Sequence, residues 1–199
     1  LYSSNINISN TKFEDIAMEW FNNIKFQVKE STGNKYWNLL YLYILPTYGG
    51  HELTDITYEF IEKSCNELLI SGGVKKAGLS PKTVSDVLAL IRSILKFAIR
   101  KGNKVPCDGR TIQIRQRIHP IKVLSKKDQE RLCRYLYDNF SLYNMGILIC
   151  LFTGLRIGEI CALRWEDISF PENTIYVHQT LQRIQYKENQ GKRTKVVIT

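Results

Sequence analysis

The sequence lacks the features that mark several classes of protein. No apolar run approaches the ~18 residues that a membrane-spanning helix needs, and no signal peptide opens the chain. The 5 cysteines are an odd number, scattered and never in C-x-x-C spacing, so we expect reduced thiols rather than disulfides. Three histidines, His51, His119 and His178, lie far apart, which argues against a zinc site. We therefore expect a cytoplasmic protein without a metal or other cofactor.

Positive charge is what the chain has in excess. The formal net charge is +9, which favours a polyanionic partner. Residues 96–134 hold 12 Lys/Arg against 3 Asp/Glu, whereas the rest of the chain holds 16 against 16. A solvated charged face, the usual explanation of a basic run, normally mixes both signs. The concentration of the whole excess in one segment therefore predicts contact with nucleic acid.

Four helices are predicted in the first 102 residues from hydrophobic periods and capping residues. Their expected starts or bounds are, in chain order, Thr11, 32–45 with a stop at Pro46, Asp55, and Ser80-Pro81. In the fourth helix Arg92, Lys96 and Arg100 repeat every four residues and so form one stripe. Three cations alone are usually a solvated face. Because the basic segment follows directly, we interpret the stripe as a surface that follows phosphates.

Residues 103–123 predict a basic interdomain linker. The segment contains prolines and glycine, carries several cations and has no sustained helical period. Isoleucines at 112, 114 and 118 suggest an extended piece that lies against one domain. Residues 124–199 then predict a second domain with helices over 126–139 and 142–152, a strand over 174–182, a turn at 189–191 and a strand over 194–198. The two strands would form a ribbon.

The most informative stretch is Thr153-Gly154-Leu155-Arg156-Ile157-Gly158-Glu159. An apolar run that stops at Thr-Gly and resumes with apolar residues at Ile157, Ile160 and Leu163 predicts a buried helix, a glycine turn and a second helix. Arg156 would open that helix, where free backbone N–H groups and a forked guanidinium suit a phosphate. Glu159 lies one turn on and can hold the guanidinium in one rotamer. From spacing alone, a purely structural Arg–Glu pair remains open.

The full pattern Thr-Gly-x-Arg-x-x-Glu, followed by Leu163, Trp165 and Asp167-Ile168, resembles the first arginine box of the tyrosine recombinase (phage integrase) family. The sequence is most similar to integrases of conjugative transposons of low-GC bacteria. The resemblance implies a mainly α protein with a helical-bundle core-binding domain over residues 1–102. The N-terminal part of an α+β catalytic domain with a small β-ribbon would follow over residues 124–199.

The resemblance also assigns roles to residues. The arginine of the box contacts the scissile phosphate in the family, which implies that role for Arg156, with Glu159 as its support. In relatives the second and fourth helices of the core-binding domain approach DNA, and the connector lets the two domains close around the duplex. The DNA-binding candidates are therefore Lys35, Asn38, Arg92, Lys96, Arg100, Arg115, Arg117 and Lys122.

The expected activity is site-specific recombination, by which a mobile element is integrated or excised. The family cleaves duplex DNA through a 3′-phosphotyrosine intermediate and works as a tetramer on two duplexes. A second box, His-x-x-Arg, is absent after Arg156, and none of the 11 tyrosines stands in the context of the nucleophile. The lysines of the ribbon stay unassigned. We therefore expect a piece of a longer protein, cut before Leu1 and inactive alone.

Two other classes of function are compatible with parts of the sequence. In a non-enzymatic DNA-binding regulator, the helical domain would dock on DNA while Arg156 merely holds a core pair. The sequence beyond residue 199 would separate the two, since an enzyme must continue with His-x-x-Arg and a tyrosine. An RNA-binding helical protein is less well supported, because the aromatic stacking motifs expected of it are missing.

Overall fold

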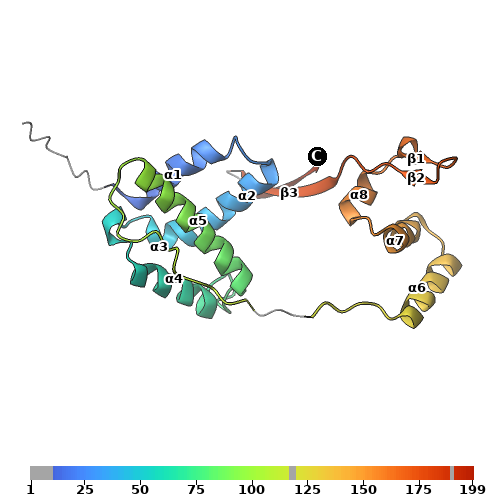
Figure 1. Cartoon of the computed structure of the whole chain (residues 1–199), viewed down its shortest axis with the longest axis horizontal. Coiled ribbons are helices and arrows are strands. Elements are labelled where there is room, and N and C mark those ends of the chain that lie inside the picture. The colour runs from blue at the N-terminus through green and yellow to red at the C-terminus, as the bar shows by residue number, and fades with distance from the viewer. Residues whose placement is uncertain (1–10, 117–119, 189–190) are drawn as a thin grey trace, which may run out of the picture. The chain divides into compact units, whose positions relative to one another are not determined.

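The computed structural model describes residues 11–116, 120–188 and 191–199 (Figure 1). The chain divides into two compact units, Leu1–Ile118 and His119–Thr199. We describe each unit by itself.

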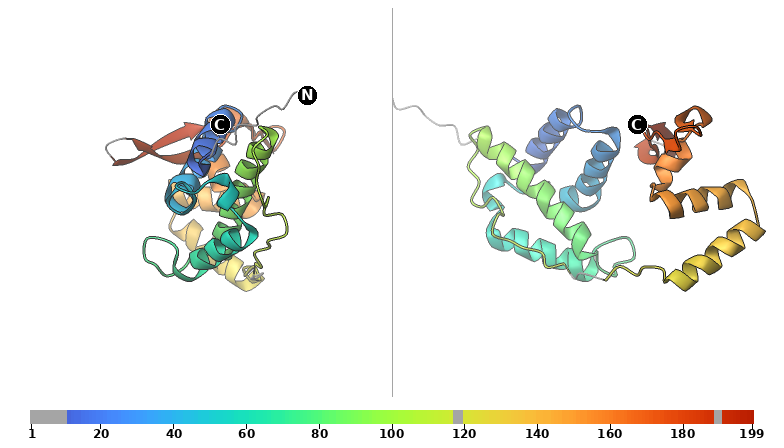
Figure 2. Two further views of the ribbon diagram at one scale, coloured as in Figure 1. Left: turned by 90° about the vertical axis from the view of Figure 1, so that its left-hand side faces the viewer. Right: turned by 45° about the vertical axis from the view of Figure 1, so that its right-hand side comes forward.

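The first unit is helical. Its elements are α1 Phe13–Ile24, α2 Glu30–Leu39, the π-helical turn η1 Leu40–Ile44, α3 Leu45–Tyr48, the 3-10 turn η2 Leu53–Asp55, α4 Tyr58–Ser71 and α5 Pro81–Arg100. The long helix α5 packs against α1, α2, η1 and α4. The ribbon views show α1 and α2 on one side of α5 and α4 on the other (Figures 1 and 2). The first unit is thus a helical bundle packed around α5, as the sequence predicted for this part of the chain.

Helix α5 follows the prediction closely. The Ser80 hydroxyl oxygen accepts the N–H of Thr83 at 3.1 Å, and Pro81 is the first helical residue. Its buried residues recur every three or four positions, as an amphipathic helix requires: Val84, Val87, Leu88, Leu90, Ile91, Ile94, Leu95 and Ala98. Each fully buried Val, Leu or Ile side chain stabilises the fold by roughly 1.5–3 kcal/mol relative to an exposed one. The row therefore supplies the centre of the core of this unit.

The prediction that Pro46 stops the second helix is wrong. The chain stays helical through Tyr48 because η1 inserts a π turn, in which the N–H of Leu45 donates to the carbonyl of Leu40. Pro46 then lies in the first turn of α3, where its missing N–H costs little. The π turn also keeps Leu40 and Ile44 fully buried.

The third helix begins three residues later than expected. Thr57, not a residue before Asp55, is the N-cap, and its side chain accepts the N–H of Phe60 at 3.2 Å. Asp55 ends the short turn η2. Local hydrogen bonding by Asp and Thr therefore placed the helix start, which hydrophobic period alone does not locate.

The first part of the predicted linker packs on the helical unit. Ile112 is only 4% exposed, and Val105, Cys107 and Ile114 lie against the same core. The isoleucines at 112 and 114 therefore lie against one domain, as their character suggested. Ile118 lies outside the described residues.

The second unit combines helices with two small antiparallel sheets. Its elements are α6 Lys126–Asp138, α7 Leu142–Thr153, α8 Ile157–Ala162, the 3-10 turn η3 Trp165–Asp167, β1 Ile168–Ser169, β2 Thr174–Ile175, β3 Leu181–Glu188 and β4 Gly191–Ile198. Strand β1 pairs with β2, and β3 pairs with β4 from Leu181↔Ile198 to Glu188↔Gly191. The mainly α fold with a two-stranded ribbon is therefore confirmed.

The strand predicted over 174–182 is split. Thr174 and Ile175 pair with β1, and the ribbon begins only at Leu181. Alternation of apolar residues cannot distinguish one strand from two short ones with different partners. Most of the predicted turn at 189–191 lies outside the described residues. Over the described ranges, no helix has both the length and the apolar character that crossing a membrane demands.

Candidate DNA-binding surface and arginine box

A glycine turn brings the arginine box together. Helix α7 ends at Thr153 because Gly154 adopts a left-handed conformation, with φ of 72°, which glycine accepts without strain. The Thr153 side-chain oxygen then accepts the N–H of Leu155 at 3.2 Å. This turn places Arg156 at the N-cap of α8, as the sequence predicted.

Glu159 holds Arg156 at two points. The backbone N–H of Arg156 donates to Glu159 Oε2 at 2.8 Å, and the guanidinium Nη1 donates to Oε1 at 3.0 Å. The Glu159 side chain is 19% exposed, whereas that of Arg156 is 86% exposed. A guanidinium has five N–H donors. Most of the guanidinium donors of Arg156 therefore face solvent, while Glu159 holds its backbone N–H and Nη1.

The same contacts keep Glu159 ionised. The backbone N–H of Arg156 and then its guanidinium lower the pKa of this carboxyl below its ordinary value. A depressed carboxyl pKa means that the contact contributes stability at neutral pH, and that the contribution is lost as pH falls through the lowered pKa. The pair is thus fully formed near pH 7. Its role at a phosphate remains a prediction.

Helix α8 differs in two respects from the expectation. It has only 6 residues, so the guanidinium, rather than the helix end, is the group suited to an anion here. Ile157 is 71% exposed and does not point into a core, whereas Ile160 and Leu163 are half-buried. The apolar period alone does not show that Ile157, the first residue after the N-cap, lies at the surface.

Gly158 brings α8 close to the ribbon. A Cβ at this position would lie 2.6 Å from Thr180 Oγ1 and 2.8 Å from the carbonyl oxygen of Leu181. Both distances are below normal contact, and the carbonyl belongs to backbone. The close approach therefore needs a residue without a side chain.

Replacing Gly158 by alanine should destabilise the second unit by about 1–2 kcal/mol, because overpacking exceeds the gain in helix propensity. The matched control is Gly146→Ala in α7, whose Cβ would meet Ile160 at an ordinary 3.8 Å. It should stabilise the unit by up to about 1 kcal/mol. Urea unfolding followed through amide signals of the second unit measures both. Equal effects of the same sign would contradict the close approach.

A buried carboxylate fastens the segment after α8. Asp167 is 5% exposed and accepts the backbone N–H of Arg164 at 2.8 Å. His178 Nε2 lies 3.4 Å from its other oxygen, and the Asp167 carbonyl accepts the N–H of Tyr176 at 2.9 Å. The sequence singled out Asp167 only as part of the box and missed His178. Nothing in the local pattern linked two residues that far apart.

The predicted basic stripe of α5 borders a groove on the first unit. The groove has a volume of about 470 Å³. Its lining residues come from α5 and the following segment: Ala89, Arg92, Ser93, Lys96, Ile99, Arg100, Asp108 and Arg110. Lys96 and Arg100 are exposed, and Arg92 is half-buried. The structure thus brings the three predicted cations together and adds Arg110, which helical periodicity could not find because it lies beyond the helix.

Arg92 differs from its neighbours in the stripe. Its Nε donates to the carbonyl oxygen of Gly109 at 3.0 Å, and its Nη2 donates to the carbonyl of Ile112. These nitrogens form one edge of the planar group. Its phosphate contact stays a prediction, and the edge formed by Nε and Nη2 is hydrogen-bonded within the protein.

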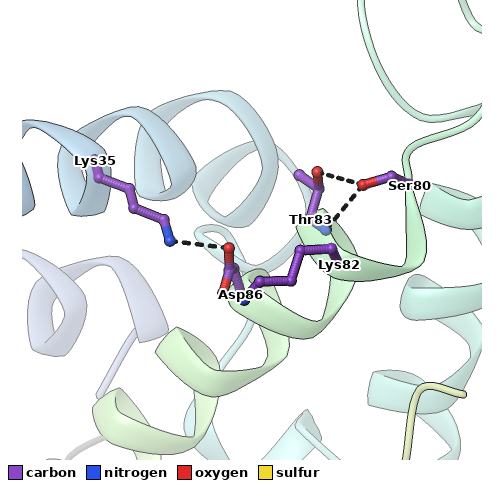
Figure 3. A network of polar contacts seen from close by, with 5 residues as sticks. All are labelled: Lys35, Ser80, Lys82, Thr83 and Asp86. Carbon is purple, nitrogen blue, oxygen red and sulfur yellow. Dashed lines mark hydrogen bonds and ion pairs between the residues drawn. The ribbon is translucent and has the colours of Figure 1, made fainter. Parts of the chain in front are cut away.

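Lys35 shares a carboxylate with another lysine. Its Nζ lies 2.9 Å from Asp86 Oδ2, while Lys82 Nζ lies 2.8 Å from Oδ1 (Figure 3). The hydrogen bond from Lys82, and then that from Lys35, lowers the pKa of Asp86. This network joins α2 to the start of α5. Asn38, three residues after Lys35, is half-buried on α2.

The remaining candidates lie between the helical elements. Arg115 and Lys122 are exposed, and Arg117 lies outside the described residues.

All 5 cysteines are free thiols. Within the described ranges, no three His, Cys, Asp or Glu side chains gather where they could hold a metal ion.

A helical unit, followed by a unit in which a glutamate-held arginine opens a short helix beside a β-ribbon, is the architecture of a tyrosine recombinase. The model of the phage integrase family matches residues 122–198, and that of the phage integrase N-terminal SAM-like domain matches residues 12–69. The chain belongs to the phage integrase family.

Curated relatives agree. Prophage integrase IntR of Escherichia coli K12 is 30% identical over 130 residues, covering 62% of this chain and 30% of the relative. The tyrosine recombinase XerC-like protein of Caldanaerobacter subterraneus subsp. tengcongensis is 23% identical over 95% of this chain and 49% of its own length. The Prophage ps2 probable integrase of Lactococcus lactis is 23% identical over 90% and 47%, respectively. The chain thus spans half or less of the length of these relatives.

Solved structures share the fold. The Tn1549 transposon integrase, in complex with circular intermediate DNA, matches 92% of this chain and 59% of its own chain with a TM-score of 0.68 and 19% identity. A lambda integrase dimer bound to a COC′ core site matches 94% of this chain and 49% of its own chain with a TM-score of 0.66 and 13% identity. Both likenesses establish the fold.

Proposed function

We propose that this chain is part of a site-specific DNA recombinase that integrates or excises a mobile element. Its substrate would be duplex DNA at recombination sites. The observation that carries the proposal is the arginine box: in a chain of this family, Glu159 fixes the base of Arg156 while the guanidinium stays 86% exposed to solvent. The exposed guanidinium donors that Glu159 does not engage are free to bind an anion. The alternative of a non-enzymatic regulator is less well supported.

Two further observations support DNA as the substrate. The first is the groove lined by Lys96, Arg100 and Arg110, which presents several cations on one surface. The second comes from structural neighbours, since the Tn1549 and lambda integrases were captured with DNA. The likeness to the Tn1549 integrase favours a transposon element. By the same resemblance, the working form would be a tetramer on two duplexes, in the bacterial cytoplasm.

Arg156 would act on the scissile phosphate. When a tyrosine oxygen attacks the scissile phosphate, the bond from phosphorus to the 5′ oxygen breaks and a 5′-hydroxyl leaves. Negative charge builds on the non-bridging oxygens, and a forked guanidinium held in advance stabilises that charge without a metal. The phosphotyrosine product keeps the bond energy needed for religation. The nucleophile would be supplied by sequence that these 199 residues do not contain.

The 199 residues alone should bind duplex DNA and leave it uncleaved. A nicked suicide substrate traps any covalent adduct, which denaturing gel electrophoresis then detects. We expect a shifted complex in a native gel and no adduct. An adduct would contradict our assignment of the nucleophile, and an absent complex would contradict the proposed substrate.

A longer chain containing His-x-x-Arg and a candidate tyrosine is the positive control. It should form the adduct on the same substrate. If such a chain binds DNA but forms none, the regulator is the better description.

A further inference from the structure

Arg92 belongs to the basic stripe of α5, but its guanidinium is hydrogen-bonded within the protein. It is half-buried, and its Nε and Nη2 donate to the carbonyls of Gly109 and Ile112. These two donors form the edge with which an arginine most readily grips two oxygens of one anion. A guanidinium bound this way is poorly placed to take a phosphate by the same edge.

The carbonyls that Arg92 binds belong to a defined turn. Gly109 is buried with φ of 70°, a conformation that favours glycine, and its carbonyl also accepts the N–H of Ile112 at 3.2 Å. Ile112 is 4% exposed and anchors the far end of the turn in the core. Arg92 therefore ties the turn of residues 108–112 to α5 from inside, next to an apolar anchor.

The turn of residues 108–112 adds a fourth cation, Arg110, to the groove that the three cations of α5 line. Arg110 is 77% exposed and lines the groove together with Lys96 and Arg100. Asp108 also lines it, and its carboxylate lies 2.6 Å from Arg110 Nε. This ion pair uses one of the five donors of Arg110. The pair orients the guanidinium and leaves a net excess of positive charge along the groove.

We infer that Arg92 is a positioning residue that holds the 108–112 turn against α5, so that Arg110 faces the same DNA backbone as Lys96 and Arg100. The inference rests on the proposed function, because it assigns the groove to phosphates of duplex DNA. In place of a direct phosphate contact for Arg92, it gives the DNA-contacting role to Arg110.

A double-mutant cycle on the 199-residue chain tests the inference. The probe is a duplex carrying a recombination half-site, and the quantity is the slope of log K against log[salt]. Arg110→Gln should make the slope shallower by about 0.9, the value for one phosphate contact. Arg92→Gln should do the same, and the double variant should lose no more than either single one. Additive losses of about 1.8 would mean that Arg92 contacts phosphate itself, which overturns the inference.

Arg92→Lys separates charge from geometry. Lysine keeps the positive charge but cannot donate to both carbonyls at once, so the slope of log K against log[salt] should become shallower, as it does for Arg92→Gln. A wild-type slope in Arg92→Lys would overturn the positioning role. Lys63→Gln, at an exposed lysine of α4, removes one charge elsewhere and should leave the slope unchanged.

Hydrogen exchange in the free protein tests, without DNA, whether Arg92 holds the 108–112 turn against α5. In Arg92→Gln the Ile112 amide should exchange at least about tenfold faster, because its partner carbonyl loses a support, while amides in the middle of α5 stay protected. An unchanged exchange rate of the Ile112 amide would contradict the positioning role of Arg92. If the wild-type chain bound no duplex at all, the proposed function would fail, and exchange at Ile112 would still decide whether Arg92 holds the turn.

Discussion

In a longer chain that supplies the tyrosine nucleophile, Arg156→Lys should slow DNA cleavage by a factor of ~10²–10³ while duplex affinity changes little. A lysine keeps the charge but loses the fork that would bind two oxygens of the scissile phosphate. Binding should survive, because the many other phosphate contacts supply most of the affinity. The two quantities are measured separately, as covalent adduct formed per unit time and as fraction of duplex bound.

Arg164→Lys is the matched control for this experiment. Arg164 is also exposed, precedes a short helical turn and pairs with a nearby glutamate, Glu166, at 3.0 Å. It lies outside the proposed contact, so its replacement should leave cleavage within a few-fold of wild type. Cleavage near wild type in Arg156→Lys would make Arg156 a structural pair. Joint loss of binding and folding would show that the residue serves the fold instead.

DNA affinity should fall steeply with salt. Each phosphate neutralised contributes about −0.9 to the slope of log K against log[salt], so 6–10 contacts would lower affinity ~10³–10⁵-fold between 50 and 200 mM salt. The physical reason is the release of counterions from the duplex by the basic residues of the 96–134 segment. Fluorescence anisotropy with a labelled duplex across a salt series gives the slope.

The double variant Lys96→Gln with Arg100→Gln tests whether the groove on α5 contributes to the salt dependence of DNA affinity. Both side chains are exposed and line the same groove, so the slope should become shallower by about 1.8. Lys63→Gln is again the control. A wild-type slope near zero would rule out backbone contacts by the basic segment.

The sequence was most reliable where a residue type has one local physical use. Ser80, the expected start of the fourth helix, accepts the N–H of Thr83, and Ser125, just before the helix predicted over 126–139, accepts that of Asp128. Gly154 was recognised as a turn and adopts positive φ. Such features depend on a few neighbouring residues, so local chemistry determines them.

Two of the errors have a different origin. Pro46 ends most helical patterns, but here a π turn just before it lets the helix continue. The segment 174–182 carries apolar Ile175, Val177 and Leu181 in the period of one strand, yet its two parts have different partners in space. In both cases the outcome depends on what packs against the segment, and a local pattern does not contain that information.

The candidate site was predictable to a similar extent. Periodicity placed Arg92, Lys96 and Arg100 on one face, and they do line one groove. It could not show that Arg92 turns its fork towards two carbonyls, nor that Arg110 joins the groove from another segment. Roles within a stripe depend on long-range contacts that spacing does not encode.

Asp86, whose carboxylate Lys35 and Lys82 share, lowers the free-energy cost of moving Lys35 to another partner. When a lysine leaves a lone aspartate for a phosphate, the abandoned carboxylate must be rehydrated or remain uncompensated, which opposes the transfer. Asp86 keeps a second cation at 2.8 Å if Lys35 moves away. If Lys35 contacts DNA as the resemblance implies, it can leave Asp86 for a phosphate while Lys82 still neutralises that carboxylate.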